Sequence, residues 1–231
     1  MYAPLLKQIV IMILNFIYFH TNMNYYISVK GEQNMTQFEQ LDLLLNEYGG
    51  TIQTFQVIDN GISKPIFYSY VKERGLEQAA HGVYVSPDTW TDAMYILHIR
   101  CSQAVFSHET ALFFHDLTDR EPLKYTITVR TGYNPSRLHD DGFQVYTVKK
   151  DLHEKGITTM QTPFGHSVPV YDMERTVCDL LRSRNNIEMQ VFQDALKQYA
   201  RRKDKNLRTL MKYASMFHVE KILRPYLEML L

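Results

Sequence analysis

The chain has 231 residues, of which 45% are hydrophobic, so it holds enough apolar material for one large domain or two small ones. Its 25 Lys and Arg residues balance 25 Asp and Glu residues, and an even spread of this neutral charge would argue against a nucleic-acid partner. The charge is uneven, however: residues 36–150 carry 10 basic and 14 acidic side chains, a net of −4, whereas residues 151–231 carry 13 and 10, a net of +3.

Residues 1–34 differ in character from the rest of the chain. Residues 8–19 are mostly apolar and follow Lys7, as in the core of a signal peptide, but no small-residue cleavage site comes after them. The stretch is also shorter than a comfortable transmembrane helix. We therefore expect translation to begin at Met35 and residues 1–34 to be an extension that is untranslated or disordered.

Residues 35–87 have the pattern of a winged helix-turn-helix domain. The order is a short helix, a second helix, a turn at residues 60–63, a third helix and a strand that ends on residues 82–85. Proteins with this order place the third helix in the major groove of DNA. The sequence therefore predicts a DNA-binding domain here.

The first two helices of this domain have clear boundary signals. Gly49 and Gly50 end the first helix, because glycine adopts the left-handed conformation without steric cost. Thr51 is expected to cap the second helix, with Phe55 and Ile58 on its buried side.

The third helix is the candidate recognition element. Ser63 suits its N-cap and Pro65 suits its first turn, after a sharp bend at Gly61. Four of its side chains can reach phosphates or base edges, and none is acidic: Lys64, Tyr68, Lys72 and Arg74. Ser63 completes this candidate set, while Glu73 should point elsewhere. The alternative is a protein–protein module built from the same elements.

Residues 88–231 are expected to form a mixed α/β domain with a helical C-terminus, so the predicted fold class is α/β (α+β). Two helices are predicted first, over residues 90–101 and, capped by Ser107, over residues 109–117. Extended segments are predicted over residues 125–130, 143–148, 156–161 and 168–170. Four helices are then predicted over residues 172–182, 188–202, 206–217 and 219–230.

The helix that begins at Asp172 also contains the sequence Asp-Met-Glu-Arg-Thr. We interpret this motif as structural, with Asp172 as the cap and with Val177, Leu180 and Leu181 on the core face. Cys101 and Cys178 lie in apolar helical contexts and have no CxxC or Cys/His ligand spacing. Buried free thiols of this kind fit a reducing cytoplasm.

A basic cluster follows near the C-terminus, interrupted only by Asp204. Its members are Lys197, Arg201, Arg202, Lys203, Lys205, Arg208 and Lys212. Such a run is either a solvated helix face or a second contact with DNA or an acidic partner.

Candidate catalytic motifs are incomplete. His108 and Glu109 resemble the start of a zincin motif, but His115 lies seven residues after His108 and not at the required spacing. Two sets in the order acid–acid–base resemble those of metal-dependent nucleases: Asp151, Glu154 and Lys155, and Asp172, Glu174 and Arg175. Each set lies within one turn or helix start, where acids more naturally complement a helix dipole. We therefore expect neither an enzyme nor a metal or cofactor.

Taken together, several segments resemble the AbiEi-type antitoxins of abortive-infection, or type IV, toxin–antitoxin systems in phage defence. The segments are the predicted winged helix with Gly82-Val83-Tyr84-Val85, Phe106-Ser107-His108-Glu109-Thr110-Ala111-Leu112, Tyr125-Thr126-Ile127-Thr128-Val129, the stretch of residues 168–179, and the basic helical tail. The resemblance covers nearly all of residues 35–231.

The resemblance implies a cytoplasmic transcriptional repressor that binds inverted repeats of double-stranded DNA in its own promoter. It also implies an antitoxin activity in the C-terminal domain against a nucleotidyltransferase toxin, with which no stable complex forms. The third helix would then contact DNA, and the wing near His81 would touch the DNA backbone or the minor groove. A second basic patch would comprise Arg201, Arg202, Lys203 and Lys205. The N-terminal extension and the neutral overall charge depart from the family pattern.

Two other function classes remain open. One is a standalone winged-helix regulator whose C-terminal domain senses a ligand or a partner. The other is a metal-dependent nuclease that uses the acidic sets named above. Neither alternative requires a membrane.

Overall fold

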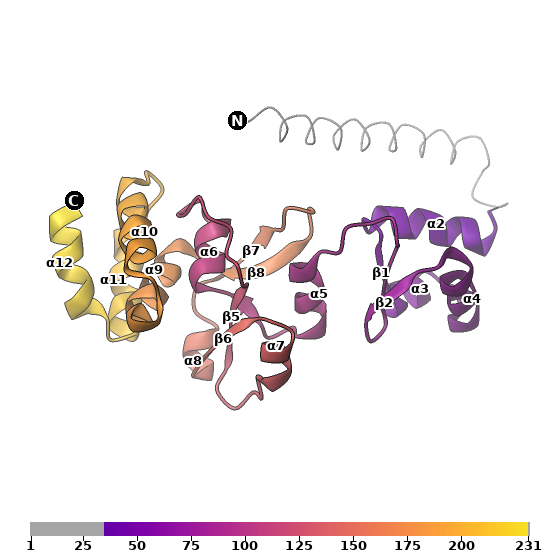
Figure 1. Cartoon of the computed structure of the whole chain (residues 1–231), viewed down its shortest axis with the longest axis horizontal. Coiled ribbons are helices and arrows are strands. Elements are labelled where there is room, and N and C mark those ends of the chain that lie inside the picture. The colour runs from indigo at the N-terminus through magenta and orange to yellow at the C-terminus, as the bar shows by residue number, and fades with distance from the viewer. Residues whose placement is uncertain (1–34, 231) are drawn as a thin grey trace. The chain divides into compact units, whose positions relative to one another are not determined.

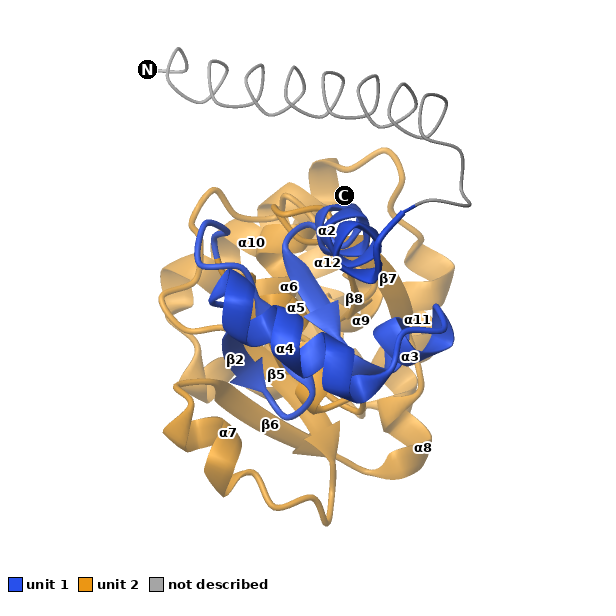
Figure 2. Ribbon diagram, turned by 90° about the vertical axis from the view of Figure 1, so that its right-hand side faces the viewer, with its two compact units in different colours: residues 1–90 blue, residues 91–231 orange. Residues whose placement is uncertain are grey.

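The computed structural model describes residues 35–230, so the expectations for residues 1–34 concern a part of the chain outside this description. The chain divides into two compact units between Trp90 and Thr91 (Figure 2). Each unit contains helices and one sheet, so the fold is mixed α/β. No helix within residues 35–230 is both long enough and apolar enough to cross a membrane.

Within residues 35–90, the first unit contains three helices and three short strands, which Figure 1 places in the chain. In chain order they are α2 (Gln37–Glu47), β1 (Thr51–Gln53), α3 (Thr54–Asp59), α4 (Lys64–Arg74), β2 (Glu77–Ala80) and β3 (Val83–Val85). The strands form an antiparallel sheet in the order β1-β3-β2. The core between the helices and this sheet includes Leu41, Ile52, Val57, Phe67 and Tyr70, all fully buried.

Helix α2 begins and ends as local chemistry dictates. The Thr36 hydroxyl accepts a hydrogen bond from the Glu39 amide, and the Glu39 side chain accepts one from the Thr36 amide, which completes a capping box. The predicted glycine stop is confirmed, because Gly49 and Gly50 have φ of 60° and 81°. A Cβ at Gly50 would lie 2.1 Å from Thr89 Oγ1, so the position also has no room for a side chain.

The prediction for the start of the second helix was wrong. Thr51 begins strand β1, where it pairs with Val85, and Gln53 occupies the N-cap of α3. Val57 is the buried residue of α3, whereas Phe55 and Ile58 are 57% and 42% exposed. Pairing with a strand more than thirty residues away sets this boundary, so the local capping signal at Thr51 is overridden.

The second unit contains a five-stranded sheet in the order β6-β5-β4-β8-β7. Its strands are β4 (Val105–Phe106), β5 (Thr126–Arg130), β6 (Gln144–Val148), β7 (Ile157–Gln161) and β8 (Ser167–Tyr171). The pairs β5–β6 and β4–β8 are parallel, while β4–β5 and β7–β8 are antiparallel. The four extended segments predicted from the sequence are confirmed, and β4 is an additional central strand that the sequence did not indicate.

Helices of the second unit precede, connect and follow the strands of this sheet in the chain. They are α5 (Ala93–Arg100), α6 (His108–Phe114), α7 (Ser136–Asp140), α8 (Lys150–His153), α9 (Met173–Arg182), α10 (Met189–Arg201), α11 (Leu207–Met216) and α12 (Glu220–Leu230), with a 3-10 turn η2 (Arg184–Asn186). The helix predicted over residues 90–101 begins later than expected, because Asp92 caps it and Trp90 is 84% exposed. Helices α7 and α8 were not predicted.

Two apolar clusters stabilise the second unit. One lies on the sheet and includes Phe106, Ile127, Val129 and Val170. The other joins α9 to the three helices that follow it, which gather on one side of this unit (Figure 1). The core face predicted for α9 is confirmed, since its predicted members are fully buried. Both cysteines are buried free thiols, as predicted.

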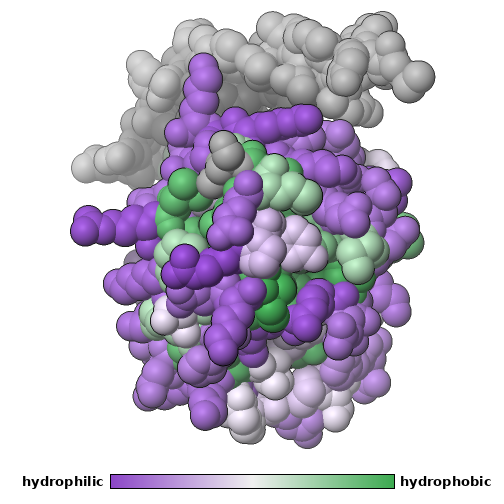
Figure 3. Space-filling model, turned by 90° about the vertical axis from the view of Figure 1, so that its left-hand side faces the viewer, coloured by the Kyte–Doolittle hydropathy of each residue, from purple (hydrophilic) through white to green (hydrophobic). Residues whose placement is uncertain are grey.

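Helices α10 to α12 expose a mostly hydrophilic surface with apolar side chains gathered in its middle (Figure 3). Met229 on α12 is strongly exposed, while Ile222, Tyr226 and Leu227 are partly buried against the helical cluster. These helices therefore turn one face to the core and present a polar border to solvent.

Candidate nucleic-acid interface

A tight turn fixes the start of α4 in the first unit. Gly61 has a φ of 78°, a conformation that favours glycine, and the buried Ile62 donates a backbone hydrogen bond to the Val57 carbonyl. Ser63 is the N-cap, as predicted, although its side chain makes no capping hydrogen bond, and Pro65 lies in the first turn. The turn and the buried plug thus hold α4 at a fixed angle to α3.

Helix α4 has one buried and one exposed face. Phe67 and Tyr70 are buried in the core of the unit. Lys64, Tyr68 and Lys72 are exposed and follow one another at four-residue spacing, so they form a single ridge on the helix. The Tyr68 ring is 48% exposed and contacts the Tyr84 ring edge-on at 6.4 Å, which limits its movement.

Arg74, the fourth predicted contact on this helix, has a partner within the first unit. Its Nη2 donates a 2.6 Å hydrogen bond to Asp42 Oδ2 on α2. The Tyr70 hydroxyl donates a 2.7 Å hydrogen bond to the other oxygen of Asp42. Hydrogen bonding to Asp42 raises the pKa of the Arg74 guanidinium above its usual range, so its charge is tied to the α2–α4 contact.

The hairpin turn between β2 and β3 provides a second exposed element. His81 lies at its tip and is exposed. The next residue, Gly82, accepts a 2.8 Å hydrogen bond from the Thr54 amide at the start of α3. This bond anchors the hairpin to the helical part of the unit.

The charge of the first unit limits its attraction for phosphates. Residues 35–90 contain 3 Lys and Arg residues against 7 Asp and Glu residues, a net of −4. Because non-specific affinity for DNA depends on the phosphates that a protein neutralises, this unit alone can supply little of it.

The structure divides the basic cluster of the second unit into two kinds of residue. Arg202 donates two hydrogen bonds of 2.8 Å to Asp204, and Lys205 donates one of 3.0 Å to the Arg202 carbonyl. These residues close the turn between α10 and α11. Arg201 and Lys203 are exposed at the same turn and form no ion pair within residues 35–230.

Three further members of the cluster lie on the helices beside this turn. Lys197 on α10 is within 3.8 Å of Asp194, with both side chains about half exposed. Arg208 and Lys212 are exposed on α11 at four-residue spacing. The cations available to an external partner are therefore concentrated on the turn and on α11.

Three acids of the sets that resembled nuclease sites make structural contacts. Asp172 caps α9 by accepting a 2.7 Å hydrogen bond from the Arg175 amide, as predicted. Glu174 accepts hydrogen bonds from the Tyr199 hydroxyl and the Asn206 amide. In the other set, Glu154 forms an exposed ion pair with Arg130. Among the described residues, no group of three or more His, Cys, Asp or Glu side chains is placed to hold a metal ion.

The histidines of the zincin-like motif point in different directions. His108 is buried, and its ring nitrogens lie 3.0 Å from the hydroxyls of Ser107 and Ser183. His115 donates from Nε2 to the Tyr171 carbonyl at 2.7 Å. Both rings thus hold parts of the second unit together.

Comparisons with known proteins bear on the fold alone. No family model matches the chain, and no curated protein matches it. Among solved structures it is similar to the crystal structure of the RV2827C protein from Mycobacterium tuberculosis, with a TM-score of 0.54 and 10% sequence identity over 80% of this chain and 73% of that chain. At this identity the similarity shows a shared fold.

Proposed function

We propose that the first unit is a winged helix-turn-helix domain that binds double-stranded DNA, with α4 in the major groove. One observation carries the proposal: Lys64, Tyr68 and Lys72 form an exposed ridge on a helix that a tight turn and a buried face hold in place. The antiparallel order β1-β3-β2 and the exposed hairpin tip at His81 agree with a wing beside that helix.

The three ridge residues suit different parts of the DNA. Lysine ammonium groups bind phosphates or guanine edges, and the Tyr68 ring can contact base edges or thymine methyl groups. Arg74 orients α4 through Asp42 in this proposal, so its direct share in DNA binding is small. Sequence reading comes from the ridge, and the wing adds a contact to the backbone or minor groove.

Part of the affinity comes from the second unit in this proposal. Arg201, Lys203, Arg208 and Lys212 are exposed cations, whereas residues 35–90 have a net charge of −4. Arg202 and Lys205 support the turn that presents them. Phosphate neutralisation by these residues would make binding strongly dependent on salt.

We further propose that the protein is an AbiEi-type antitoxin that represses its own toxin–antitoxin operon. The support is the combination of sequence segments that resemble this family with a first unit that exposes the α4 ridge and precedes a larger α/β unit. Inverted repeats in its own promoter would be the target, and a nucleotidyltransferase toxin would be counteracted without a stable complex. A nucleotidyltransferase gene beside the coding sequence separates this proposal from a standalone regulator.

A mobility-shift experiment on the DNA upstream of the protein's own coding sequence tests the DNA-binding proposal. We expect the parent chain to bind, and the double variant Lys64→Ala/Lys72→Ala to bind far more weakly. Lys221→Ala removes an exposed lysine from α12, outside both candidate surfaces, and is the matched control. Unchanged binding by the double variant would show that α4 is not the recognition helix.

A growth assay tests the antitoxin proposal separately. Co-expression with the neighbouring nucleotidyltransferase should restore growth of cells that the toxin alone arrests. If co-expression does not restore growth and the two genes do not lie in one operon, the protein is a regulator of another kind.

A further inference from the structure

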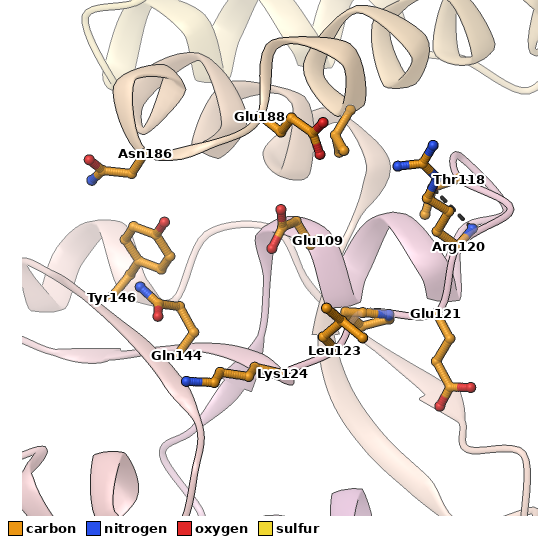
Figure 4. Close-up of a pocket in the computed structure, with 12 residues that line it drawn as sticks. Glu109, Thr118, Arg120, Glu121, Leu123, Lys124, Gln144, Tyr146, Asn186 and Glu188 are labelled. Carbon is orange, nitrogen blue, oxygen red and sulfur yellow. Dashed lines mark hydrogen bonds between the residues drawn. The ribbon is translucent and has the colours of Figure 1, made fainter.

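A cavity of about 430 Å³ opens in the second unit, and none of the basic residues discussed above lines it. Its walls come from α6, the loop that leads from α6 to β5, the edge strand β6, and the segment from η2 into α10 (Figure 4). These elements are far apart in the sequence, so the cavity is a product of the tertiary fold. Its size is in the range of sites for small molecules.

Two carboxylates face each other across this cavity. Glu109 belongs to the first turn of α6, and Glu188 immediately precedes α10 (Figure 4). Within the described part of the chain, neither of them forms an ion pair. Burial and the neighbouring Glu188 raise the pKa of the Glu109 carboxyl. The cavity thus holds two like charges that a cation between them would compensate.

An aromatic ring forms another part of the wall. Tyr146 on β6 lines the cavity, and its ring stacks on the His108 ring with centroids 3.8 Å apart and planes 15° apart. His108 has a φ of 49°, and the hydroxyls of Ser107 and Ser183 hold both of its ring nitrogens. The tyrosine ring is therefore supported from behind by a residue that is itself fixed.

The combination of groups favours an organic cation over a metal ion. Paired carboxylates bind the planar fork of a guanidinium, and an aromatic ring attracts the same cation through its π system. A metal site would require more oxygen or nitrogen ligands around one point. We propose that this cavity binds a small guanidinium compound, which lies between Glu109 and Glu188 and beside Tyr146.

Two cations of the protein narrow the ligand class. Arg120 and Lys124 also line the cavity, and they would attract a carboxylate group on the ligand. The side-chain amides of Gln144 and Asn186 add neutral hydrogen-bonding groups. An amino acid with a guanidinium side chain matches these charges, so L-arginine is the probe of choice.

Calorimetric titration of the full chain with L-arginine tests the proposal, and L-citrulline is the matched ligand because it replaces the guanidinium by a neutral urea of the same shape. We expect L-citrulline to bind at least about tenfold more weakly, as expected for loss of charge-assisted hydrogen bonds. Glu109→Gln and Glu188→Gln should each weaken L-arginine binding by about tenfold or more.

Glu121→Gln is the matched protein control. Glu121 lines the same cavity, but its carboxylate points away from the facing pair and accepts a hydrogen bond from the Tyr125 hydroxyl (Figure 4). Its replacement should leave L-arginine affinity within about twofold, since only long-range screened charge is lost. Thermal unfolding of each variant confirms that it is folded, and the two glutamine variants on different elements serve as independent tests.

Three results would overturn the proposal. The first is no heat of binding for the parent chain with L-arginine. The second is equal affinity for L-arginine and L-citrulline. The third is an effect of Glu121→Gln as large as that of Glu109→Gln and Glu188→Gln, which would indicate general surface attraction.

Discussion

Asp42 Oδ2 on α2 accepts a 2.6 Å hydrogen bond from Nη2 of Arg74 on α4. The second oxygen of the same carboxylate accepts a hydrogen bond from the buried Tyr70. One partly buried acid thereby connects α2 to a buried residue and to an exposed residue of α4. The orientation of the helix proposed to read DNA depends on a residue that would itself repel DNA.

Replacement of Asp42 by alanine should destabilise the first unit. The Tyr70 hydroxyl would lose its acceptor in a buried setting, which costs roughly 1–3 kcal/mol of unfolding free energy. Arg74→Ala removes only the exposed partner, so its effect on stability should be clearly smaller. Urea unfolding of the two variants measures both values. Equal losses would mean that the ion pair, and not the tyrosine contact, stabilises the helix.

Salt titration of DNA binding separates the α4 cations by role. Lys64→Ala and Lys72→Ala should each reduce the slope of log affinity against log salt by about one, since each removes one phosphate contact. Arg74→Ala should change this slope less, because the guanidinium is bound to Asp42. A larger change for Arg74→Ala than for either lysine variant would contradict the role given to the ridge.

Arg175→Met should severely destabilise the second unit. The Arg175 guanidinium is fully buried, donates to Asp179 at 2.9 Å and to the Leu152 carbonyl at 2.6 Å, and lies 3.9 Å from the centroid of the Phe217 ring. Its removal would leave a buried carboxylate without its main partner, at a cost of roughly 3–5 kcal/mol. Arg182→Met is the matched control, because Arg182 contacts the same carboxylate from a partly exposed position.

Chemical denaturation measures the free energy of unfolding of these two variants. The cost of Arg182→Met should stay below about 1 kcal/mol, as for other solvent-accessible pairs. Comparable losses in both variants would show that the buried guanidinium contributes no more than a surface cation.

Two glycines of the second unit, on neighbouring turns, test whether a side chain there is opposed by lack of space as well as by backbone strain. Gly156 and Gly165 have φ of 75° and 85°, so alanine is strained at both, by roughly 1–2 kcal/mol. A Cβ at Gly156 would also lie 2.8 Å from the Cβ of Arg175, whereas a Cβ at Gly165 would meet nothing within 4 Å. Gly156→Ala should therefore lower the melting temperature more than Gly165→Ala. A similar decrease in both variants would mean that backbone strain alone causes the loss of stability.

The sequence predicted those elements whose signals are local. Helix α9 has a capping aspartate and a periodic core face, so its start at Met173 and its end at Arg182 match the expectation closely. Strand β4 has only two residues and exists because Val105 and Phe106 pair with β5, and Phe106 also with β8. No local pattern distinguishes such a segment from a loop.

The same limit applies to the candidate sites. The exposed ridge on α4 could be predicted, because residues at four-residue spacing share a face once the helix is known. The pairing of Arg74 with Asp42 could not, since it depends on how α2 packs against α4. The cavity at Glu109 and Glu188 was missed for the same reason, because its walls meet only in the folded chain.

The buried His108 should make stability depend on pH. Burial lowers the pKa of its imidazole to about 4 in the folded state, from an ordinary value of 6.5. Between these values the unfolded chain binds the proton and the folded chain does not, so stability falls as the pH falls from 6.5 toward 4, by up to about 3 kcal/mol. Burial lowers the pKa values of His98 and His153 as well, and they act in the same direction.

His108→Asn should flatten this dependence in part, since asparagine tolerates the left-handed backbone at φ 49° and does not titrate. Urea midpoints measured across this pH range give the slope for each protein. His139→Asn, at an exposed histidine of α7, should leave the slope as in the parent. If His108→Asn also retains the full slope, the acid sensitivity arises from groups other than the His108 imidazole.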